Sequence, residues 1–243
     1  MNDSEPRNPF TTKGFIVGAA IVGVLALSGI VLGVTSLDAG DDGNTAAVPG
    51  ASTPTPSSTI SAEAESVCGL AGYEDSYELT APPAVKWSIT GTVAVPSSDT
   101  AGPGQVDEDG FRSCYAHTAD GALLSAISFV ALSSDTQTAA RVTELVAPGP
   151  GKDIALSANT PGSNPSSGRL QLAGYKITSY SATESVVDLA WEVTSAGGQL
   201  VSLPVALKWA EGDWKVELAD NGQPRFTASP LQSLGGYTSW NGV

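Results

Sequence analysis

Residues 187–193 read VDLAWEV and residues 203–209 read LPVALKW. In both segments large apolar side chains alternate with polar or small ones, which is the two-residue period of a β-strand with one buried face. The Gly197-Gly198 pair separates the two segments, and the Glu211-Gly212 pair leads into a third alternating run that ends at Leu218. The pattern predicts an antiparallel meander with one face buried and the other in contact with water.

The segment before this meander changes its phase. Leu170 and Leu172 have even numbers, whereas Tyr175 has an odd number. These side chains share one buried face only if the strand gains a residue near Gly174, as in a β-bulge. Because bulges bend sheets, the predicted sheet is curved. Pro204 cannot donate to a ladder, so it predicts an edge position or a second irregularity.

Two helices are expected before the meander. Thr118 can cap the first helix, in which apolar side chains recur along one stripe from residue 123 to residue 131. Asp135 can cap the second helix, and Pro148-Gly149 ends its apolar repeat. The predicted fold class is therefore α+β, a cone-like domain of a curved antiparallel sheet packed on two or three helices. The other expected elements are a single strand over 86–95, a polar loop over 97–110 and a long loop over 148–168.

A membrane helix is predicted over residues 15–37, which contain no charged residue and no proline. As a helix, about 23 residues span roughly 34 Å, enough to cross a hydrocarbon core of about 30 Å. Arg7 and Lys13 precede this segment, and the next cation is Lys86. The positive-inside rule then places the N-terminus in the cytoplasm and the C-terminal domain outside the cell membrane. A cleaved signal peptide is the alternative, although its apolar region runs to only about 7–15 residues.

The sequence divides into four parts. Residues 1–14 form a cytoplasmic tail and residues 15–37 form the single membrane helix. Residues 38–66, which are rich in Ser, Thr, Pro and Gly, are predicted to be a disordered stalk. Residues 67–243 are predicted to be the extracytoplasmic α+β domain.

Four glycines in or beside the membrane segment are candidate contacts between membrane helices. Gly14 and Gly18 are four residues apart, as are Gly29 and Gly33. Small residues at this spacing let two helices approach closely, which fits a homo-oligomer. The alternative is that glycine is simply frequent in membrane helices.

The charge balance argues against nucleic acid as a direct partner. The chain has 11 Lys and Arg against 25 Asp and Glu, a formal net charge of -14. The acidic excess lies in the predicted outer part, whereas phosphate binding needs clustered cations. It also argues against docking on anionic lipid headgroups.

The two cysteines, Cys68 and Cys114, both lie in the predicted outer domain. Disulfides persist outside the cell, so we expect these two to be joined. Two cysteines and one histidine are too few for a standard structural zinc site, which needs four such ligands. We expect neither a metal nor another cofactor.

No set of catalytic residues emerges from the sequence. His117 is the only histidine, and we expect it to be structural and bonded to the loop before the first helix. Asp188 and Glu192 share one face of a strand but lie about 13 Å apart, too far to share a proton. The acidic triplet 107–109 lacks the ligand spacing of a known calcium loop. We therefore expect no enzymatic activity.

The C-terminal aromatics Tyr237 and Trp240 follow the last strand of the meander. We expect this tail to fold back and close the open end of the cone. The alternative is an exposed apolar patch, which would make these two residues a candidate protein interface.

Four segments between residues 68 and 243 carry a resemblance to known proteins. The most specific is the run YAHTADGALL at 115–124. The order of helices followed by a curved sheet resembles the nuclear-transport-factor-like fold, also called cystatin-like. More closely, the chain resembles membrane-anchored proteins of high-GC Gram-positive bacteria that are linked to conjugative elements. The other segments are Val95-Pro96-Ser97 with Gly102-Pro103, Gly212-Asp213-Trp214 and Gly236-Tyr237-Thr238-Ser239-Trp240.

This resemblance implies a setting and no chemistry, because no catalytic residues are known for the family. The expected function is a membrane-anchored scaffold or docking subunit of a cell-envelope assembly, with conjugative type IV secretion as the candidate assembly. Its partners are then envelope proteins and further copies of itself. The alternative is a ligand-binding or enzymatic cone, since this fold also hosts isomerases and dehydratases. A surface antigen or adhesion module is a third hypothesis that the sequence leaves open.

Overall fold

The computed structural model describes residues 65–77, 81–157 and 169–242. The predicted cytoplasmic tail, the predicted membrane helix with its four glycines, and all but the end of the predicted stalk lie outside these ranges. Within these ranges, no helix combines the length and the apolar character needed to cross a membrane.

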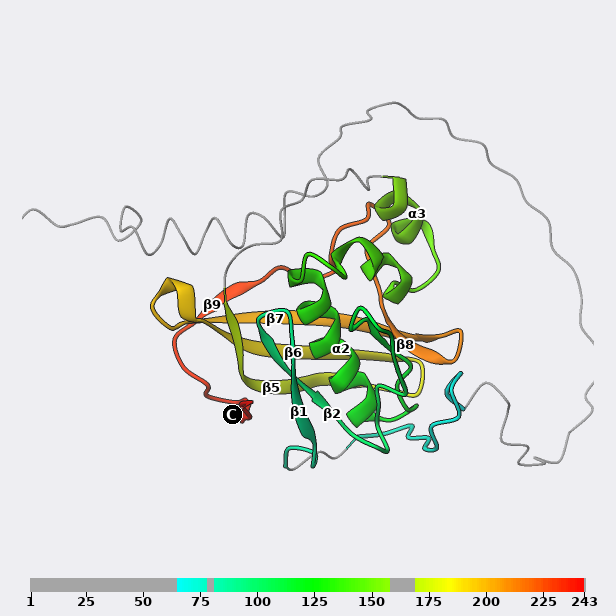
Figure 1. Cartoon of the computed structure of the whole chain (residues 1–243), viewed down its shortest axis with the longest axis horizontal. Helices are drawn as coiled ribbons and strands as arrows, with labels where there is room; N and C mark the ends of the chain where they lie inside the picture. Colours follow the sequence, from blue (N-terminus) through cyan, green and yellow to red (C-terminus); the bar gives the residue numbers. More distant parts are fainter. Residues whose placement is uncertain (1–64, 78–80, 158–168, 243) are drawn as a thin grey trace, which may run out of the picture.

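The main sheet is antiparallel throughout, with strand order β10-β5-β6-β7-β8 and β9 beside the other half of β7. Figure 1 shows β5, β6 and β7 running side by side as its long central strands. The predicted meander is therefore confirmed. The strands are β5 (Leu170–Tyr180), β6 (Glu184–Val193), β7 (Gln199–Ala210), β8 (Asp213–Val216), β9 (Ser229–Leu231) and β10 (Thr238–Ser239).

Two irregularities in β5 curve this sheet. The register between β5 and β6 shifts between Leu172 and Gly174, which confirms the predicted bulge, and shifts again between Ile177 and Ser179. Pro204 lies between the part of β7 that pairs with β9 and the part that pairs with β8. Its missing N–H therefore falls in a gap of the ladder on that side, as the sequence predicted.

The central helix α2 (Ala119–Ser134) begins where the sequence predicted. Thr118 is its N-cap, and the side chain of Thr118 accepts a hydrogen bond from the N–H of Gly121 at 3.1 Å. The helix lies across one face of the sheet (Figure 1). It is buried on nearly all sides and not along one stripe, because residues 93–97, residues 112–113 and the segment after the helix pack on it as well. Its many Ala and Ser side chains permit this close packing.

The expected single strand over 86–95 is wrong. The structure has a hairpin of β1 (Lys86–Thr90) and β2 (Val93–Ser97), which turns at Gly91 with a φ of 57°. A glycine adopts this left-handed conformation without steric cost, and Thr90 and Thr92 on its two sides hide the turn in the sequence pattern because threonine is typical of strands. The expected loop over 97–110 contains β3 (Gln105–Val106), which pairs with β4 (Arg112–Ser113).

The segment after α2 differs from the expected α-helix and loop. Residues Ala139–Leu145 form the 3-10 helix η3. The predicted cap at Asp135 is wrong, because Thr138 is the N-cap of η3, and Asp135 is instead the C-cap of α2, where its side chain accepts from the N–H of Gln137 at 3.1 Å. Within the expected loop, Pro150–Ser157 form the α-helix α3. Proline is compatible with the first turn of a helix because the N–H it lacks would have no helical partner there.

The alternation predicted that the outer face of the sheet is exposed to water, but part of this face is buried. Leu189 and Trp191 are buried on the α2 side, but Asp188 and Ala190 on the opposite side are buried as well. The C-terminal segment accounts for this burial. It pairs with β7 at one edge through β9 and with β5 at the other edge through β10, and its Tyr237 hydroxyl donates to Asp188 Oδ2 at 2.6 Å.

Candidate functional site

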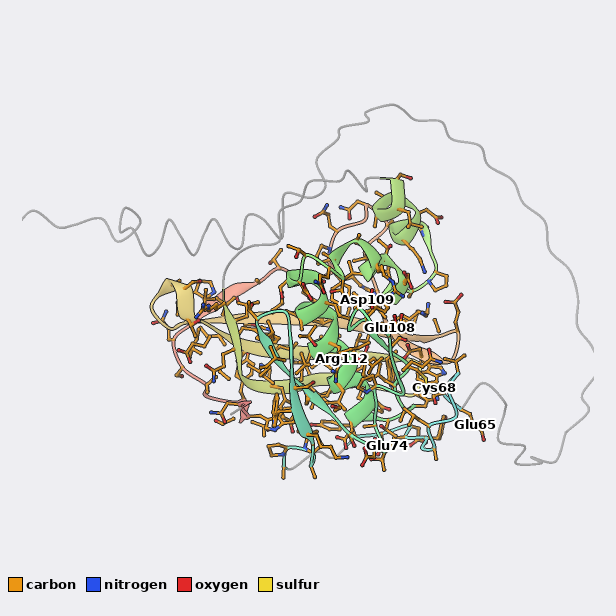
Figure 2. The ribbon with its side chains drawn as sticks, viewed as in Figure 1. Glu65, Cys68, Glu74, Glu108, Asp109 and Arg112 are labelled. Atoms are coloured by element: carbon orange, nitrogen blue, oxygen red, sulfur yellow. A yellow bond between two sulfur atoms is a disulfide. The ribbon has the colours of Figure 1, made fainter. Side chains whose placement is uncertain are left out.

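Cys68 and Cys114 form a disulfide, as expected, with their Cα atoms 6.2 Å apart. The bond joins the first described segment of the chain to the residue that follows β4. Figure 2 shows Cys68 and Glu65 together at the side of the domain where this segment begins. The N–H of Val67 also donates to the carbonyl of Gly212 at 2.8 Å. The first described segment is therefore tied to the fold at both of these positions.

A buried carboxylate lies directly beside this disulfide. Asp213, at the start of β8, accepts hydrogen bonds from the N–H groups of Cys114 at 2.9 Å, Tyr115 at 2.8 Å and Trp214 at 2.9 Å. Burial raises the pKa of Asp213, while the hydrogen bonds from Tyr115 and Cys114 act in the opposite direction. This side chain fixes β8 to the strand connection that leads into α2.

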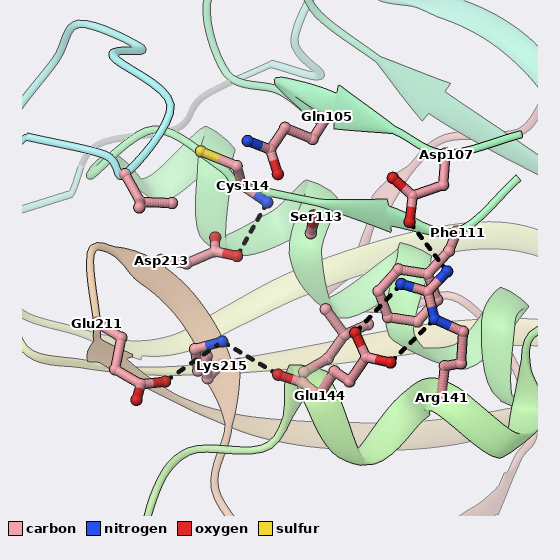
Figure 3. A pocket seen from close by; sticks show the side chains of 12 residues that line it. Gln105, Asp107, Phe111, Ser113, Cys114, Arg141, Glu144, Glu211, Asp213 and Lys215 are labelled. Atoms are coloured by element: carbon pink, nitrogen blue, oxygen red, sulfur yellow. Dashed lines mark hydrogen bonds and ion pairs between the residues drawn. The ribbon is translucent and has the colours of Figure 1, made fainter.

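A surface pocket of about 320 Å³ lies between β3, β4, η3 and the start of β8. Figure 3 shows Asp213 and Lys215 on one side of it and Arg141 and Glu144 on the other, with Gln105 and Asp107 above them. The remaining lining residues are Val67, Phe111, Ser113, Cys114, Leu145 and Glu211.

The cations of this pocket are held by its own walls. The guanidinium of Arg141 lies 2.9 Å from carboxylate oxygens of Asp107, Asp109 and Glu144, and over the ring of Phe111 at 4.0 Å. Lys215 Nζ donates to the carbonyl of Glu144 at 3.1 Å and lies 3.6 Å from Glu211. The N–H of Phe111 and the guanidinium of Arg141 hold the pKa of Asp109 below its usual range.

His117 is part of an aromatic cluster and not of this pocket. Its ring stacks on Trp209 at 3.7 Å between centroids and meets Trp214 and Tyr73 edge-on. One of its nitrogens contacts the carbonyl of Ala182 in the turn between β5 and β6, and not in the loop before the helix where we expected its partner. This packing gives His117 a clear structural role.

The carboxylates singled out in the sequence lie apart in the structure. Asp188 accepts hydrogen bonds from Ser202 at 2.7 Å and from Tyr237. Glu192 lies further along the same strand, opposite Leu200 of β7. In the acidic triplet, Asp107 and Asp109 bind Arg141. In the described ranges, no group of three or more His, Cys, Asp or Glu is arranged to hold a metal ion.

The C-terminal aromatics pack on the domain. Trp240 is 9% exposed and meets the rings of Trp87 and Tyr175 at 5.2 and 5.5 Å between centroids. The ring of Tyr237 lies under Lys176 Nζ at 4.7 Å, with its hydroxyl on Asp188. The tail thus folds back onto the sheet and the β1–β2 hairpin.

Replacing Tyr237 by Phe is expected to lower the free energy of unfolding by about 1–2 kcal/mol, because Asp188 then loses a hydrogen-bond donor in a buried place. Urea unfolding at neutral pH measures this change. Tyr73→Phe is the matched control, since it removes the same hydroxyl from a side chain that is 55% exposed, and we expect a change within about 0.5 kcal/mol. Equal effects for both variants would contradict a fastening role for Tyr237.

The pocket is the feature that sequence reasoning missed. Its walls come from segments as far apart as residues 67 and 215, and no local pattern connects them. The weak sequence signal for this pocket was the Gly-Asp-Trp turn, because its aspartate, Asp213, is one of the lining residues.

The described residues define an α+β domain, in which a curved antiparallel sheet packs on a buried helix and a disulfide ties the first described segment to the fold. The chain belongs to the family described as "Domain of unknown function (DUF8175)", whose model matches residues 47–239. No curated protein and no solved structure matches the chain.

Proposed function

We propose that this protein is a membrane-anchored extracytoplasmic docking subunit of a cell-envelope assembly, and that conjugative type IV secretion is the assembly to test first. The observation that carries the proposal is the filling of the curved sheet. The space where a cone-shaped enzyme would hold its ligand is occupied by apolar side chains of the protein itself.

The filling is complete along α2. Leu123, Leu124 and Ile127 on the helix are fully buried, and they belong to the same packed cluster as Trp191 and Trp214 of the sheet. A ligand site needs a concave space with a few convergent polar groups. His117, the side chain best suited to acid-base work, is instead stacked on Trp209 and faces a backbone carbonyl. The interior therefore favours a docking role over the ligand-binding or enzymatic alternative.

The disulfide and the sequence support the proposed location. Disulfides persist in oxidising compartments outside the cytoplasm, and Cys68–Cys114 lies in the domain that follows the apolar segment 15–37. In this proposal residues 15–37 span the membrane with the N-terminus in the cytoplasm, and residues 38–66 act as a stalk. The domain itself is a member of the nuclear-transport-factor-like, or cystatin-like, cone folds, in which helices precede a curved antiparallel sheet. Oligomers form through the glycines of the membrane helix.

Crosslinking in intact membranes tests the proposal. The full chain with a C-terminal tag is crosslinked in cells, purified in detergent and analysed by mass spectrometry. Recovery of the chain with itself and with subunits of an envelope channel is the expected result. Cells that carry the same tag on the chain without residues 1–37 provide the control for association after lysis.

Purification of a lone monomer from crosslinked cells would contradict the docking function. Protease added to intact cells gives an independent check of location. The domain should be cleaved or released, whereas a fully protected domain would contradict the proposed orientation.

A further inference from the structure

We infer that the pocket between β3, η3 and β8 is the docking site of the domain, and that it takes a basic segment of a partner protein, with Lys or Arg next to an apolar residue. This inference rests on the proposed docking function and adds to it a surface and a partner chemistry. It starts from the arrangement of charge in the pocket, which is the cavity shown in Figure 3.

The pocket presents carboxylates to the solvent and keeps its cations underneath. Three carboxylates face the solvent there beside the two cations, because the fourth lining carboxylate, Asp213, is buried and bonded to backbone N–H groups. The side chains of Asp107, Glu144 and Glu211 are 50%, 54% and 60% exposed, whereas those of Arg141 and Lys215 are 34% and 13% exposed. An approaching group therefore meets the acidic side of each ion pair.

Both cations are also already bonded to other residues of the pocket. Both terminal nitrogens and Nε of Arg141 are bonded to carboxylates, and its flat face lies on Phe111. The ammonium of Lys215 points to the carbonyl of Glu144. Each carboxylate oxygen accepts more than one hydrogen bond, so Glu144 and Glu211 retain acceptor capacity toward the solvent. The pocket is thus suited to a ligand that donates hydrogen bonds and carries positive charge.

Two exposed valines flank these carboxylates. Val67 lines the pocket and is 67% exposed, and Val106, between the lining residues Gln105 and Asp107, is 57% exposed. An interface commonly combines apolar contacts with charged groups at its rim. A basic residue next to an apolar one would satisfy both features of this surface.

Charge disfavours both the preceding segment of this chain and a second copy as the occupant. Residues 38–66, which lead to the pocket wall at Val67, carry only acidic charges. Two copies of a chain with a net charge of -14 repel one another at long range, which disfavours pairing through an acidic pocket. Charge complementarity therefore points to a basic segment of a different protein.

Binding of a labelled peptide tests the inference. The probe is the fluorescein-labelled peptide GKVRVKG, titrated with the full chain in nonionic detergent and followed by fluorescence anisotropy. We expect saturable binding that weakens at least about tenfold between low and high salt, because the contacts are ionic. A peptide of the same pattern with Glu in place of Lys and Arg should not bind. Equal binding of the two peptides, or no binding of the basic one, would overturn the inference.

Matched variants locate the binding. Glu211→Lys, and independently Val67→Lys at the rim, should each weaken binding of GKVRVKG at least about tenfold. Asp220→Lys makes the same change of charge as Glu211→Lys at an exposed residue that does not line the pocket, and should leave affinity within about twofold. Urea unfolding of each variant checks that the fold is intact. Equal weakening by Glu211→Lys and Asp220→Lys would sink the assignment to this pocket.

The same variants separate this inference from the proposed function. If crosslinked cells yield the same partners from Glu211→Lys as from the parent chain, the protein docks but does so elsewhere. If the parent chain itself is recovered alone, the docking function fails, whatever the peptide does.

Discussion

Asp213→Ala should lower the free energy of unfolding by about 3–5 kcal/mol, because it removes a buried acceptor that several buried donors share. The N–H groups of Cys114, Tyr115 and Trp214 would lose their common partner. A methyl group cannot replace it, and Cys114, Tyr115 and Trp214 are themselves buried. Urea unfolding of the purified protein, fitted to two states, measures the loss.

Asp213→Asn separates the shape of this side chain from its role as an acceptor. One oxygen still accepts from Tyr115 and Trp214, which share Oδ1, but the new amide group faces the N–H of Cys114. We expect a loss of about 1–3 kcal/mol, smaller than for Ala. A larger loss for Asn than for Ala would mean that the repulsion between donors outweighs the two retained bonds.

The pH dependence of the Asp213→Asn penalty has a definite sign. The pKa of Asp213 is raised in the folded state, mainly by burial, so folding favours its protonated form. The stability that this group contributes is fully present below the unfolded pKa of about 3.9 and falls as the pH rises through the folded value. The penalty should therefore be larger at pH 3.5 than at pH 7. Urea midpoints of parent and variant at the two pH values test this.

Loss of the disulfide should be the other large effect. The bond closes a loop with a sequence separation of 46 residues, for which the loop-entropy model gives about 4 kcal/mol. The double variant Cys68→Ser with Cys114→Ser should unfold at a much lower urea concentration. The segment that begins at residue 65 would then be joined to the fold without a covalent bond, through contacts such as the hydrogen bond from the N–H of Val67 to the carbonyl of Gly212.

Reducing agent provides the control for the disulfide. It should destabilise the parent chain by a similar amount and leave the double serine variant unchanged. A loss below about 1 kcal/mol in the variant would mean that the segment from Ser66 to Leu70 is held to the fold mainly by its hydrogen bonds, such as Val67 N–H to the Gly212 carbonyl at 2.8 Å.

Patterns in the sequence predicted the elements that are determined by residues close to one another in the chain. The alternation of Leu189 and Trp191, the cap at Thr118 and the bulge beside Gly174 all appear where the sequence placed them. Each depends on neighbours within a few residues. The curved antiparallel sheet and the α+β class followed from these features alone.

The features that the sequence did not predict depend on distant parts of the chain. Asp188 looked like a solvated residue of an exposed face, but Tyr237 covers it from 49 residues further along. In the sequence Asp213 looked like part of a common turn, yet its carboxylate oxygens accept hydrogen bonds from N–H groups 98 and 99 residues away. The hairpin over residues 86–97 was missed because Gly91 stands alone between Thr90 and Thr92, and threonine is itself typical of strands.

The C-terminal tail also constrains when the domain can become complete. Trp240 packs on Trp87, and β10 supplies the outer partner of β5, so the fold is completed by contacts between segments far apart in the sequence. Such nonlocal contacts form slowly, because the entropy of closing a long loop is lost before the contacts stabilise the fold. Docking of the tail should therefore be a late step in the folding of the domain.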